Sequence, residues 1–535
     1  MPYSVRETTR MSRESFLPPV ARNQTEVFAV QGADPEVLAF AMAKYSRSAL
    51  SMRESLNEIS SQKAEQFLNT FYFQYGHRSI ADLAHIAFAI ERLSLLAAIV
   101  LVDETRWDGQ ERSTRYQNFM KSGWYLPDFG ADSRSAALYS KTIESLFGTY
   151  QRATEAVLGL LRDKISRPDS LKQDAYDRTL RARAFDVARY LLPLATNTSL
   201  GQIVSARTLE TQVSRLLSHP AAEVRLLGEK LRDSSTAPTL VKYAQPNPYL
   251  IQTQAEMAQA ATETLSPLSS KTPPHAVVDL VERTETLEVE LAATLLYSAS
   301  HHPYRQIRDL VSGLPEARVT EIVDLGLKHR GRHDEALRAF HAGAALRFDI
   351  LMDIGGFRDM HRHRRCTQLI QGFTSQHGYE TPGAADLPAG ADILAEAGID
   401  ADFRFAIESA HRAAAQIAAG ATGEVPESCN KGTALAGPQT SQDKSGALAP
   451  EGISAPEAAQ SAQYLYPLAT RIRSLFKMDF AEAQYITELR SGPAGHFSYR
   501  RVAWEMHLAL ERQHPRLAKH IRVTDFTKPI DMLQR

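Results

Sequence analysis

A stretch of this chain occurs twice, and this repeat restricts the fold more than any other feature of the sequence. The nine residues ARYLLPLAT at 188–196 recur as AQYLYPLAT at 462–470, with seven of nine positions identical. A weaker similarity relates 39–46 to 291–298, in the same order along the chain. Internal similarity at a long spacing indicates duplicated structural units. We therefore interpret the chain as two homologous halves, with a chance match as the alternative.

The two pairs of similar segments are separated by different distances, so the second half contains additional residues. The segment 420–461 is rich in Gly, Ala, Ser, Pro and Gln and lacks apolar periodicity, which is typical of a long insertion. Turn-forming clusters at 234–238 and 266–274 predict the boundary between the halves. The expected division is a first half at 1–233, a linker at 234–276 and a second half at 277–535.

Composition excludes several classes of protein. The 535 residues contain 61 Lys and Arg against 62 Asp and Glu, which argues against a protein that holds nucleic acid by bulk charge. The longest aliphatic run, 95–102, is far shorter than the roughly 20 residues of a membrane helix, and the first residues contain no apolar signal core. Two cysteines, Cys366 and Cys429, are too few for a disulfide framework or a four-cysteine zinc site. We therefore expect a cytoplasmic protein without a membrane partner or a bound metal.

The apolar periodicity is mainly helical. Spacings of three and four residues run through 56–73, 134–165, 205–232, 321–353 and 483–512. Strand candidates are shorter: residues 84–90 alternate loosely, and 348–351 are their counterpart in the second half. These patterns predict a sheet flanked by helices in each half.

A dense cationic cluster, HRHRR at 361–365, follows a pair of glycines at 355–356. Arginine and histidine donors at this density suit phosphate or another polyanion, and the glycines permit close backbone approach. The alternative is a solvent-exposed basic face. A metal site is disfavoured, because His361, His363 and Cys366 do not follow a standard zinc spacing.

The first half offers a different group of polar residues. Ser113, Arg115 and Tyr116 supply a hydroxyl, a guanidinium and a phenol, enough to bind a phosphate and to stack on a base. Taken alone, they are typical of a polar loop.

Arg189 interrupts the apolar repeat, and its counterpart in the second half is Gln463. A buried arginine needs a partner. An anionic ligand and a salt bridge to a nearby acid such as Asp186 both satisfy that need, and both interpretations stay open. Near the C-terminus, Arg490 adds a further guanidinium at the end of a helical stretch.

In order and spacing, these elements resemble the motifs of the flavin-dependent thymidylate synthase family. The family carries a Gly-His pair, Arg-His-Arg, Ser-x-Arg-Tyr seven residues later, Ala-Arg-x-x-Leu-Pro and a final arginine. In the first half, 76–79 resembles the Gly-His element, 113–116 is Ser-x-Arg-Tyr and 188–193 is the arginine segment. The acids Asp103 and Glu104 occupy the place of Arg-His-Arg.

The second half shows the reciprocal pattern. Residues 362–364 match Arg-His-Arg, and Arg490 stands at the final arginine. Residues 374–377 replace Ser-x-Arg-Tyr, nine residues on instead of seven, and Gln463 replaces the nucleotide-binding arginine. Each half therefore lacks a motif that the other keeps.

The resemblance implies α+β halves, each a mainly antiparallel sheet with flanking helices, and sites that lie between subunits. A tandem chain is then expected to supply two subunits covalently and to form a homo-oligomer, a dimer of fused pairs. The resemblance assigns FAD to His77, Ser79, Arg362, His363 and Arg364. It assigns the nucleotide substrate to Ser113, Arg115, Tyr116, Arg189 and Arg490.

The implied activity is that of a methyltransferase that converts dUMP to dTMP. Methylenetetrahydrofolate and NADPH are the implied co-substrates, and the flavin carries the chemistry without a catalytic cysteine. Two alternatives stay open. One is a flavin enzyme that acts on another pyrimidine nucleotide, and the other is a non-catalytic descendant that binds a nucleotide or RNA.

Overall fold

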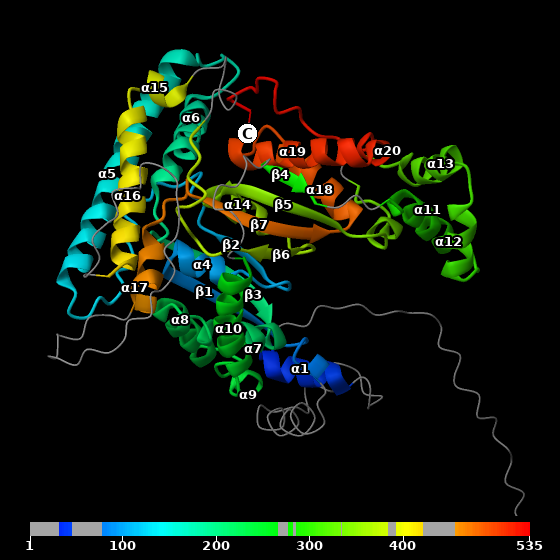
Figure 1. The fold of residues 1–535 in the computed structure, drawn as a ribbon, viewed down its shortest axis with the longest axis horizontal. Coiled ribbons are helices and arrows are strands. Elements are labelled where there is room, and N and C mark those ends of the chain that lie inside the picture. Colours follow the sequence, from blue (N-terminus) through cyan, green and yellow to red (C-terminus); the bar gives the residue numbers. More distant parts are fainter. Residues whose placement is uncertain are drawn as a thin grey trace, which may run out of the picture.

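The computed structural model contains two antiparallel sheets, one in each half of the chain (Figure 1). The residues it describes are 32–44, 78–265, 277–281, 285–332, 334–382, 392–420 and 455–534. His77, the helical window 56–73 and residues 421–454 of the expected insertion lie outside these ranges. Among the described helices, none is long and apolar enough to cross a membrane.

The first half builds a three-stranded sheet in the order β1-β3-β2. The apolar run that follows β1 forms the buried helix α4, capped by Ser94, whose Oγ accepts a hydrogen bond from the Ala97 N–H. The elements, in chain order, are β1 (His85–Ser94), α4 (Leu95–Leu101), β2 (Asp108–Glu111), α5 (Ser133–Lys164), α6 (Gln173–Ala188), η3 (Arg189–Leu191), β3 (Asn197–Ser205), α7 (Ala206–Leu217) and α8 (Ala222–Asp233).

The second half repeats this order and adds the edge strand β4 (Val278–Leu280), which gives β4-β5-β7-β6. Its helix α14 follows β5 as α4 follows β1, capped by Asp353. The elements are β5 (Leu346–Asp353), α14 (Ile354–Met360), β6 (Thr367–Ile370), α16 (Asp400–Ala418), α17 (Ala455–Ala462), η8 (Gln463–Leu465), β7 (Arg471–Met478), α18 (Phe480–Ser491) and α19 (Phe497–Gln513). The α+β fold of two homologous halves is thereby confirmed.

The two sheets agree in register. Asp108 of β2 pairs with Ile203 of β3, and Thr367 of β6 pairs with Lys477 of β7, at equivalent places. The difference is a bulge in β1 at Arg92, whose φ of 60° lies in the left-handed region and whose strand shifts register around it. Each residue of the first half can therefore be matched to an equivalent residue of the second half. The equivalent residue lies 259 positions later for Ser94 to Glu111, and 274 positions later for the repeat, β3 and α7.

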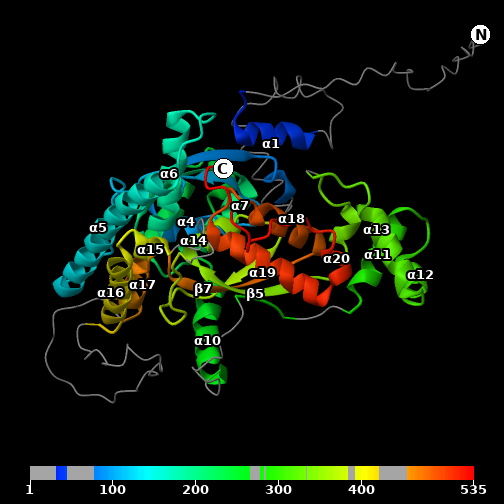
Figure 2. The ribbon, with the colours of Figure 1, turned by 90° about the horizontal axis from the view of Figure 1, so that it is seen from above.

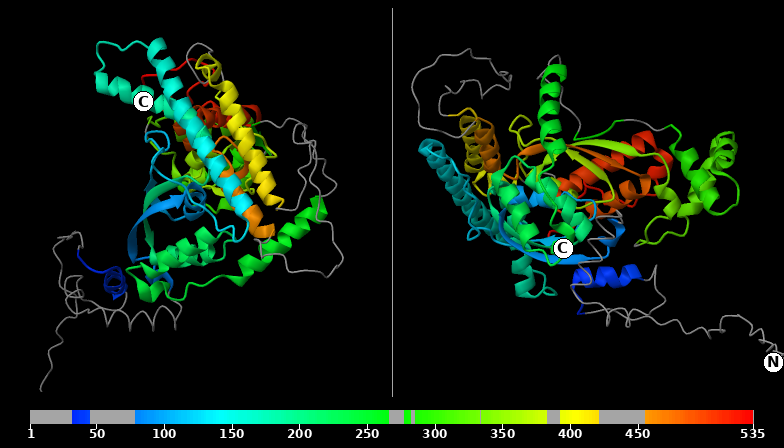
Figure 3. Two further views of the ribbon diagram at one scale, coloured as in Figure 1. Left: turned by 90° about the vertical axis from the view of Figure 1, so that its left-hand side faces the viewer. Right: turned by 90° about the horizontal axis from the view of Figure 1, so that it is seen from below.

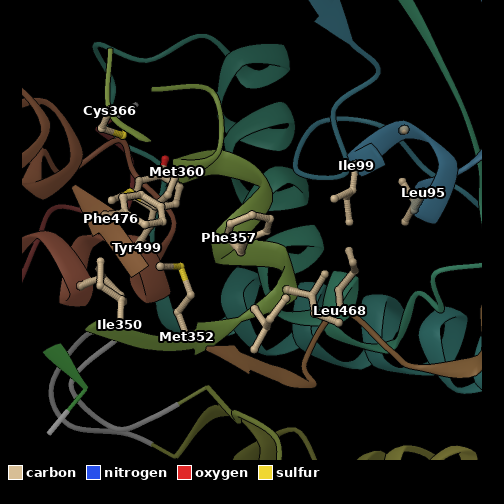
Figure 4. Close-up of a cluster of buried hydrophobic side chains, with 14 of the residues drawn as sticks. Leu95, Ile99, Ile350, Met352, Phe357, Met360, Cys366, Leu468, Phe476 and Tyr499 are labelled. Carbon is tan, nitrogen blue, oxygen red and sulfur yellow. The ribbon is translucent and has the colours of Figure 1, made fainter. Parts of the chain in front are cut away.

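The repeated nine-residue segments lie against each other, around an antiparallel bridge between Pro193 and Pro467. Each hydrogen bond across the junction has a counterpart with the halves exchanged, as at a two-fold axis. The bonds are Leu194 N–H to Tyr466 O (2.9 Å), Leu468 N–H to Leu192 O (2.9 Å), Ala195 N–H to Tyr464 O (2.8 Å) and Ala469 N–H to Tyr190 O (3.1 Å). The apolar core continues across this junction, as Figure 4 shows with Leu95 and Ile99 of α4 near Leu468.

Other helices lie around the two sheets. The long helices α5 and α16, one from each half, pack side by side (Figures 1 and 3). Helix α11 packs against α12 and α13, and this group of the second half lies at one end of the molecule, while α10 projects away from the rest (Figure 2). The remaining elements are α1 (Pro35–Lys44), η2 (Arg78–Ile80), α9 (Pro238–Val241), α10 (Pro248–Leu265), α11 (Leu287–Ser298), α12 (Tyr304–Ser312), α13 (Glu316–Leu327), η4 (Arg338–His341), α15 (Ile393–Glu396) and α20 (Pro515–Ala518).

Both strand predictions are confirmed by β1 and β5, and the helical windows 134–165 and 205–232 by α5, α7 and α8. The window 321–353 is wrong as a single helix, because α13 ends at Leu327 and β5 follows with alternate residues buried. The window 483–512 is helical except for a break around Pro493. The expected linker contains α9 and α10, and its boundaries stay a prediction.

Candidate functional site

Three arginines of the second half, Arg362, Arg364 and Arg490, line two adjoining hollows, which together we name the cationic hollow. The first, of about 320 Å³, lies between α18 and residues 362–365. The second opens toward strands β1, β2 and β3 of the first half, where Phe88 contributes to its wall. The hollow is thus built from both halves of the chain.

The end of α14 positions residues 362–364. Asp353 caps this helix by accepting a 2.6 Å hydrogen bond from the Gly356 N–H and another from Ser498 of α19. Burial raises the pKa of Asp353 to about 6, although the nearby Arg189 lowers it. A Cβ atom at position 356 would lie 2.5 Å from the Ser498 Oγ, and one at Gly355 would lie 3.3 Å from Arg189 Nη2. The space that the two glycines leave beside the backbone is therefore filled by the side chains of Ser498 and Arg189.

Arg490 brings a poorly compensated charge to the hollow. Its Nε–H donates to His363 Nε2 over 2.7 Å, and its guanidinium lies 5.4 Å from the centre of the Tyr499 ring. Within the described ranges, no carboxylate lies within 4 Å of it. Burial lowers the pKa of Arg490 and that of His363, and His363 must be unprotonated at Nε2 to accept this bond. A half-buried guanidinium without a carboxylate favours binding of an anion.

The other two arginines keep part of their donor capacity exposed. Arg362 donates to Asp359 over 2.6 Å, yet its side chain is 43% exposed. Arg364 lies over Trp107 of the first half, with its guanidinium carbon 4.5 Å from the ring centre, and is 3.7 Å from the exposed Asp108. Together with Arg490 they present an excess of positive charge to the hollow.

Acids of the first half hold the basic segment in place. His361 Nε2 lies 3.2 Å from Asp103 Oδ1, and Arg358 donates to Glu111. One acid at the place of the lost Arg-His-Arg motif, Asp103, thus contacts the residue that directly precedes the intact motif of the other half.

Two arginines expected to hold the nucleotide are buried in ion pairs instead. Arg115 donates from Nε to Asp186 over 2.7 Å and from Nη1 to the Tyr499 hydroxyl over 2.8 Å. Arg189 is 1% exposed and donates from Nη1 to Asp359 over 3.1 Å. Burial alone would raise the pKa of Asp359, but Arg189 and Arg362 hold it well below its ordinary value. Arg189 thus forms a salt bridge, as one of the two interpretations expected, but its partner is Asp359 of the other half and not Asp186.

The remaining predicted residues are not brought together in the cationic hollow. Ser113 accepts a hydrogen bond from the Arg115 N–H over 3.2 Å, and Tyr116 is 54% exposed. Ser79 is exposed on η2. As far as the described residues show, none of these three lines the hollow.

The loop after the short strand explains the missing Ser-x-Arg-Tyr motif. Equivalent hydrogen bonds, Arg112 N–H to Ser199 O and Gln371 N–H to Arg473 O, mark where each loop begins. Equivalent bonds to Gly123 O and Gly378 O mark where each ends. The loop spans 113–122 in the first half but only 372–377 in the second. The segment that would carry the motif is thus shorter by four residues in the second half, in agreement with the absence of Ser-x-Arg-Tyr there.

The first half has its own hollow at the equivalent place, which we name the acidic hollow. Asp103, Glu104, Glu210 and Arg215 contribute to its lining. Asp103 stands where Arg362 stands in the second half, and Glu104 where His363 stands. Arg215 is engaged by Glu104, to which its Nη2 donates over 2.7 Å. This hollow therefore lacks the excess positive charge of its counterpart.

Cys366 lies beside the basic segment, where it is buried and donates from Sγ to His363 O over 2.9 Å. Burial raises the pKa of its thiol to about 12, so the reactive thiolate is suppressed. Within the described ranges, no group of three or more His, Cys, Asp or Glu side chains is arranged to hold a metal ion.

The sequence profile of the thymidylate synthase complementing protein family, Thy1, matches residues 27–238 and 279–516. The chain belongs to this family. A UPF0159 protein of Chlamydia muridarum is 28% identical over 97% of this chain and 96% of its own length. A flavin-dependent thymidylate synthase of Clostridium tetani is 24% identical over 40% of this chain and 84% of its own length. The first relative thus matches the whole tandem chain, and the second matches a part shorter than one half.

Two solved structures are similar to part of this Thy1 chain. The flavin-dependent thymidylate synthase ThyX of Helicobacter pylori, complexed with FAD and dUMP, is 18% identical over 38% of this chain and 89% of that chain, with a TM-score of 0.26. The UMP/dUMP methylase PolB of Streptomyces cacaoi is 18% identical over 40% of this chain and 93% of that chain, with a TM-score of 0.28.

Sequence reasoning missed two contributors to the site of this Thy1 protein. Asp359 pairs with both Arg189 and Arg362, and Trp107 lies beneath Arg364. The signal for Asp359 was its place two residues before the basic cluster. No sequence pattern marked Trp107, which immediately precedes β2.

Proposed function

We propose that this protein is a flavin-dependent enzyme with one composite site per chain, in which the cationic hollow binds the diphosphate of FAD and dUMP is methylated to dTMP. The observation that carries the proposal is the grouping of Arg362, Arg364 and Arg490 in one hollow, with no carboxylate within 4 Å of Arg490 among the described residues. Membership of the Thy1 family, to which the hollow adds the anion-binding chemistry, supports it.

The residues present fit an FAD molecule in charge and in surface character. A diphosphate carries negative charge that arginine donors bind in a fork geometry. Beside the arginines, Phe88 and the 52% exposed Ile203 offer apolar surface, and Gly201 of β3 carries no side chain. Planar rings can pack on such a surface.

The chain itself would bind, orient and shield the ligand. When bound and reduced, the flavin supplies a hydride, with NADPH as the reductant and methylenetetrahydrofolate as the one-carbon donor. Arg362 and Arg364 would fix the phosphates, while Arg490 places a charge at the junction of the two hollows. The ion pair of Arg189 with Asp359 and the hydrogen bond from Arg115 to the Tyr499 hydroxyl would hold the two halves at a constant separation.

A second candidate is favoured by those same pairs. Arg115 and Arg189 are buried and pair with Asp186 and Asp359, so neither guanidinium is exposed to a nucleotide phosphate in this structure, although Nε and Nη2 of Arg189 have no hydrogen-bond partner among the described residues. This supports a protein that binds a flavin or a nucleotide but does not methylate dUMP, either an enzyme for another pyrimidine nucleotide or a non-catalytic binder.

FAD titration of the purified chain tests the proposal. We expect a yellow protein that releases FAD on heating, and a loss of FAD affinity of about 10- to 100-fold in Arg364→Ala and Arg490→Ala, as for a charged hydrogen bond. Arg318→Ala, which removes an exposed arginine on α13, is the matched control and should bind normally. A colourless protein that takes up no FAD would refute the proposal.

An activity assay then separates the two candidates. Formation of dTMP from dUMP, methylenetetrahydrofolate and NADPH supports the synthase. FAD binding without dTMP supports the second candidate, and trials with other pyrimidine nucleotides would follow. The proposed dimer of fused pairs is checked by the mass of the protein in solution.

A further inference from the structure

The first half contains a buried polar network that leads to the arginine of the second half. Trp107 donates from Nε1 to Gln202 Oε1 over 2.7 Å. Gln202 and Gln212 exchange amide hydrogen bonds of 3.2 and 3.3 Å, and Gln212 also donates to Leu101 O over 2.9 Å. All three side chains are buried. Such a network fixes the orientation of the indole ring, because every member has a partner.

The backbone of β2 adds a second constraint on the ring. A Cβ atom at Gly109 would lie 2.6 Å from the ring atoms Cη2 and Cζ2 of Trp107, closer than real Cβ atoms come. The indole therefore packs on the bare backbone of this residue. The ring also contacts Arg364, whose guanidinium carbon lies 4.5 Å from the ring centre.

The fold itself does not require this network, as the second half demonstrates. By register, Cys366 occupies the place of Trp107, Phe476 that of Gln202 and Ile486 that of Gln212. These three side chains are buried and apolar. The same layer can thus be packed without side-chain amides or an indole N–H, and burying two amides and an indole N–H is unfavourable unless all are paired. Packing alone therefore does not explain the polar network of Trp107, Gln202 and Gln212 in the first half.

We propose that Trp107, held by Gln202, Gln212 and the bare backbone at Gly109, is a positioning residue that presents Arg364 to the phosphoryl group of the ligand. The indole face holds the guanidinium without neutralising it, since a cation over an aromatic ring keeps its charge and its N–H donors. A buried carboxylate at this place would neutralise the guanidinium, whereas Asp108, whose Oδ1 lies 3.7 Å from Arg364 Nη1, is 92% exposed and screened by solvent. The inference rests on the proposed function, because it assigns the phosphoryl ligand to the same hollow.

Indole fluorescence tests the pair without altering it. In a Trp124→Phe/Trp504→Phe variant, Trp107 is the remaining tryptophan, since the chain contains three. We expect inorganic pyrophosphate to change its emission, because binding at Arg364 alters the charge over the ring. The same change should disappear in the added variant Arg364→Met. An emission that pyrophosphate leaves constant, or a change that persists in Arg364→Met, would overturn the proposal.

FAD affinity provides the second readout. We expect Trp107→Leu to weaken FAD binding about tenfold, as for the loss of a desolvated cation–π contact, and Trp107→Phe to keep most of the affinity. Equal FAD affinity of the wild type, Trp107→Phe and Trp107→Leu would show that Trp107 only fills the core and does not position Arg364. If Trp107→Leu does not fold, Trp107→Phe and the fluorescence test still decide.

The two proposals fail in different ways. Loss of FAD binding in Arg364→Ala with full binding in Trp107→Leu would leave the proposed function standing and remove the positioning role. Absence of FAD binding in the wild type, together with a pyrophosphate response of Trp107, would remove the FAD proposal and keep the pair of Trp107 and Arg364 as an anion site.

Discussion

The two hollows occupy equivalent places in the two halves, yet they differ in charge. Arg362, Arg364 and Arg490 line the cationic hollow, whereas Asp103 and Glu104 line the acidic one. In an oligomer of identical chains, each substitution occurs in every copy and alters every site. In a fused chain it occurs once. The difference teaches that covalent duplication allows one site to keep its ligand chemistry while the acids of the other become contacts such as Asp103 with His361.

Copying the residues of equivalent positions in the first half into the cationic hollow should have the largest effect. Arg364→Thr with Arg490→Leu places the residues of positions 105 and 216 at the equivalent sites. Because two charged hydrogen-bond donors are removed, we expect FAD affinity to fall at least about 100-fold, measured by flavin fluorescence titration. The melting temperature should change little, since the first half tolerates these residues. Affinity within threefold of the wild type would show that the difference in charge does not decide binding.

The buried pair between the halves can be tested in the same manner. Arg189→Gln copies Gln463 and leaves Arg362 as the ion-pair partner of Asp359 among the described residues, so we expect a loss of about 3 to 5 kcal/mol in the free energy of unfolding. Adding Asp359→Val, which copies Val100, should restore much of it in a double-mutant cycle followed by urea denaturation. Weakened nucleotide binding without loss of stability would instead assign Arg189 to the ligand.

The helix caps Ser94 and Asp353 differ in their response to pH. Because burial raises the folded-state pKa of Asp353 to about 6, the folded protein binds this proton more tightly than the unfolded chain does. Its stabilising contribution is present below about pH 4 and is lost as the pH rises through about 6. Asp353→Ser should remove this slope, changing the pH 4 to pH 7 difference in unfolding free energy by at most about 3 kcal/mol. Parallel pH profiles of the two proteins would contradict the assignment.

The smallest effect is expected at the surface pair between α5 and α16. Arg152 lies 3.1 Å from Asp402, and their side chains are 56% and 57% exposed. Solvent and salt screen such a pair, so Arg152→Ala should lower the free energy of unfolding by less than about 1 kcal/mol. Asp402→Ala is the matched control. A loss as large as that of Arg189→Gln would mean that α5 and α16, rather than the buried pair, hold the halves together.

The repeat predicted the fold well because it lies where the halves meet. Residues 188–196 and 462–470 bond to each other, so their side chains satisfy the same constraints in both copies. The window 321–353 failed because it joins α13 to β5, and apolar spacing over a long window does not reveal where period 3.6 gives way to period 2.

The site was predictable only in part, for a physical reason. The basic cluster at 361–365 is local in sequence and was found. The partner of Arg189 lies 170 residues away, so a local search returned Asp186, which the structure pairs with Arg115. The role of Trp107 depends on a contact between the halves that no spacing along the chain encodes.

The junction at Pro193 and Pro467 has a consequence for synthesis of the chain. The two segments that form this junction are 274 residues apart in the sequence. At a translation rate of roughly 5 to 20 residues per second, the second segment leaves the ribosome about 14 to 55 s after the first. During this time the backbone N–H groups of Leu194 and Ala195 lack their acceptors in the second half, and the apolar side of α4 lacks the residues that pack on it. The nascent first half therefore exposes apolar surface and unpaired backbone donors. We expect chains whose translation stops before β7 to aggregate.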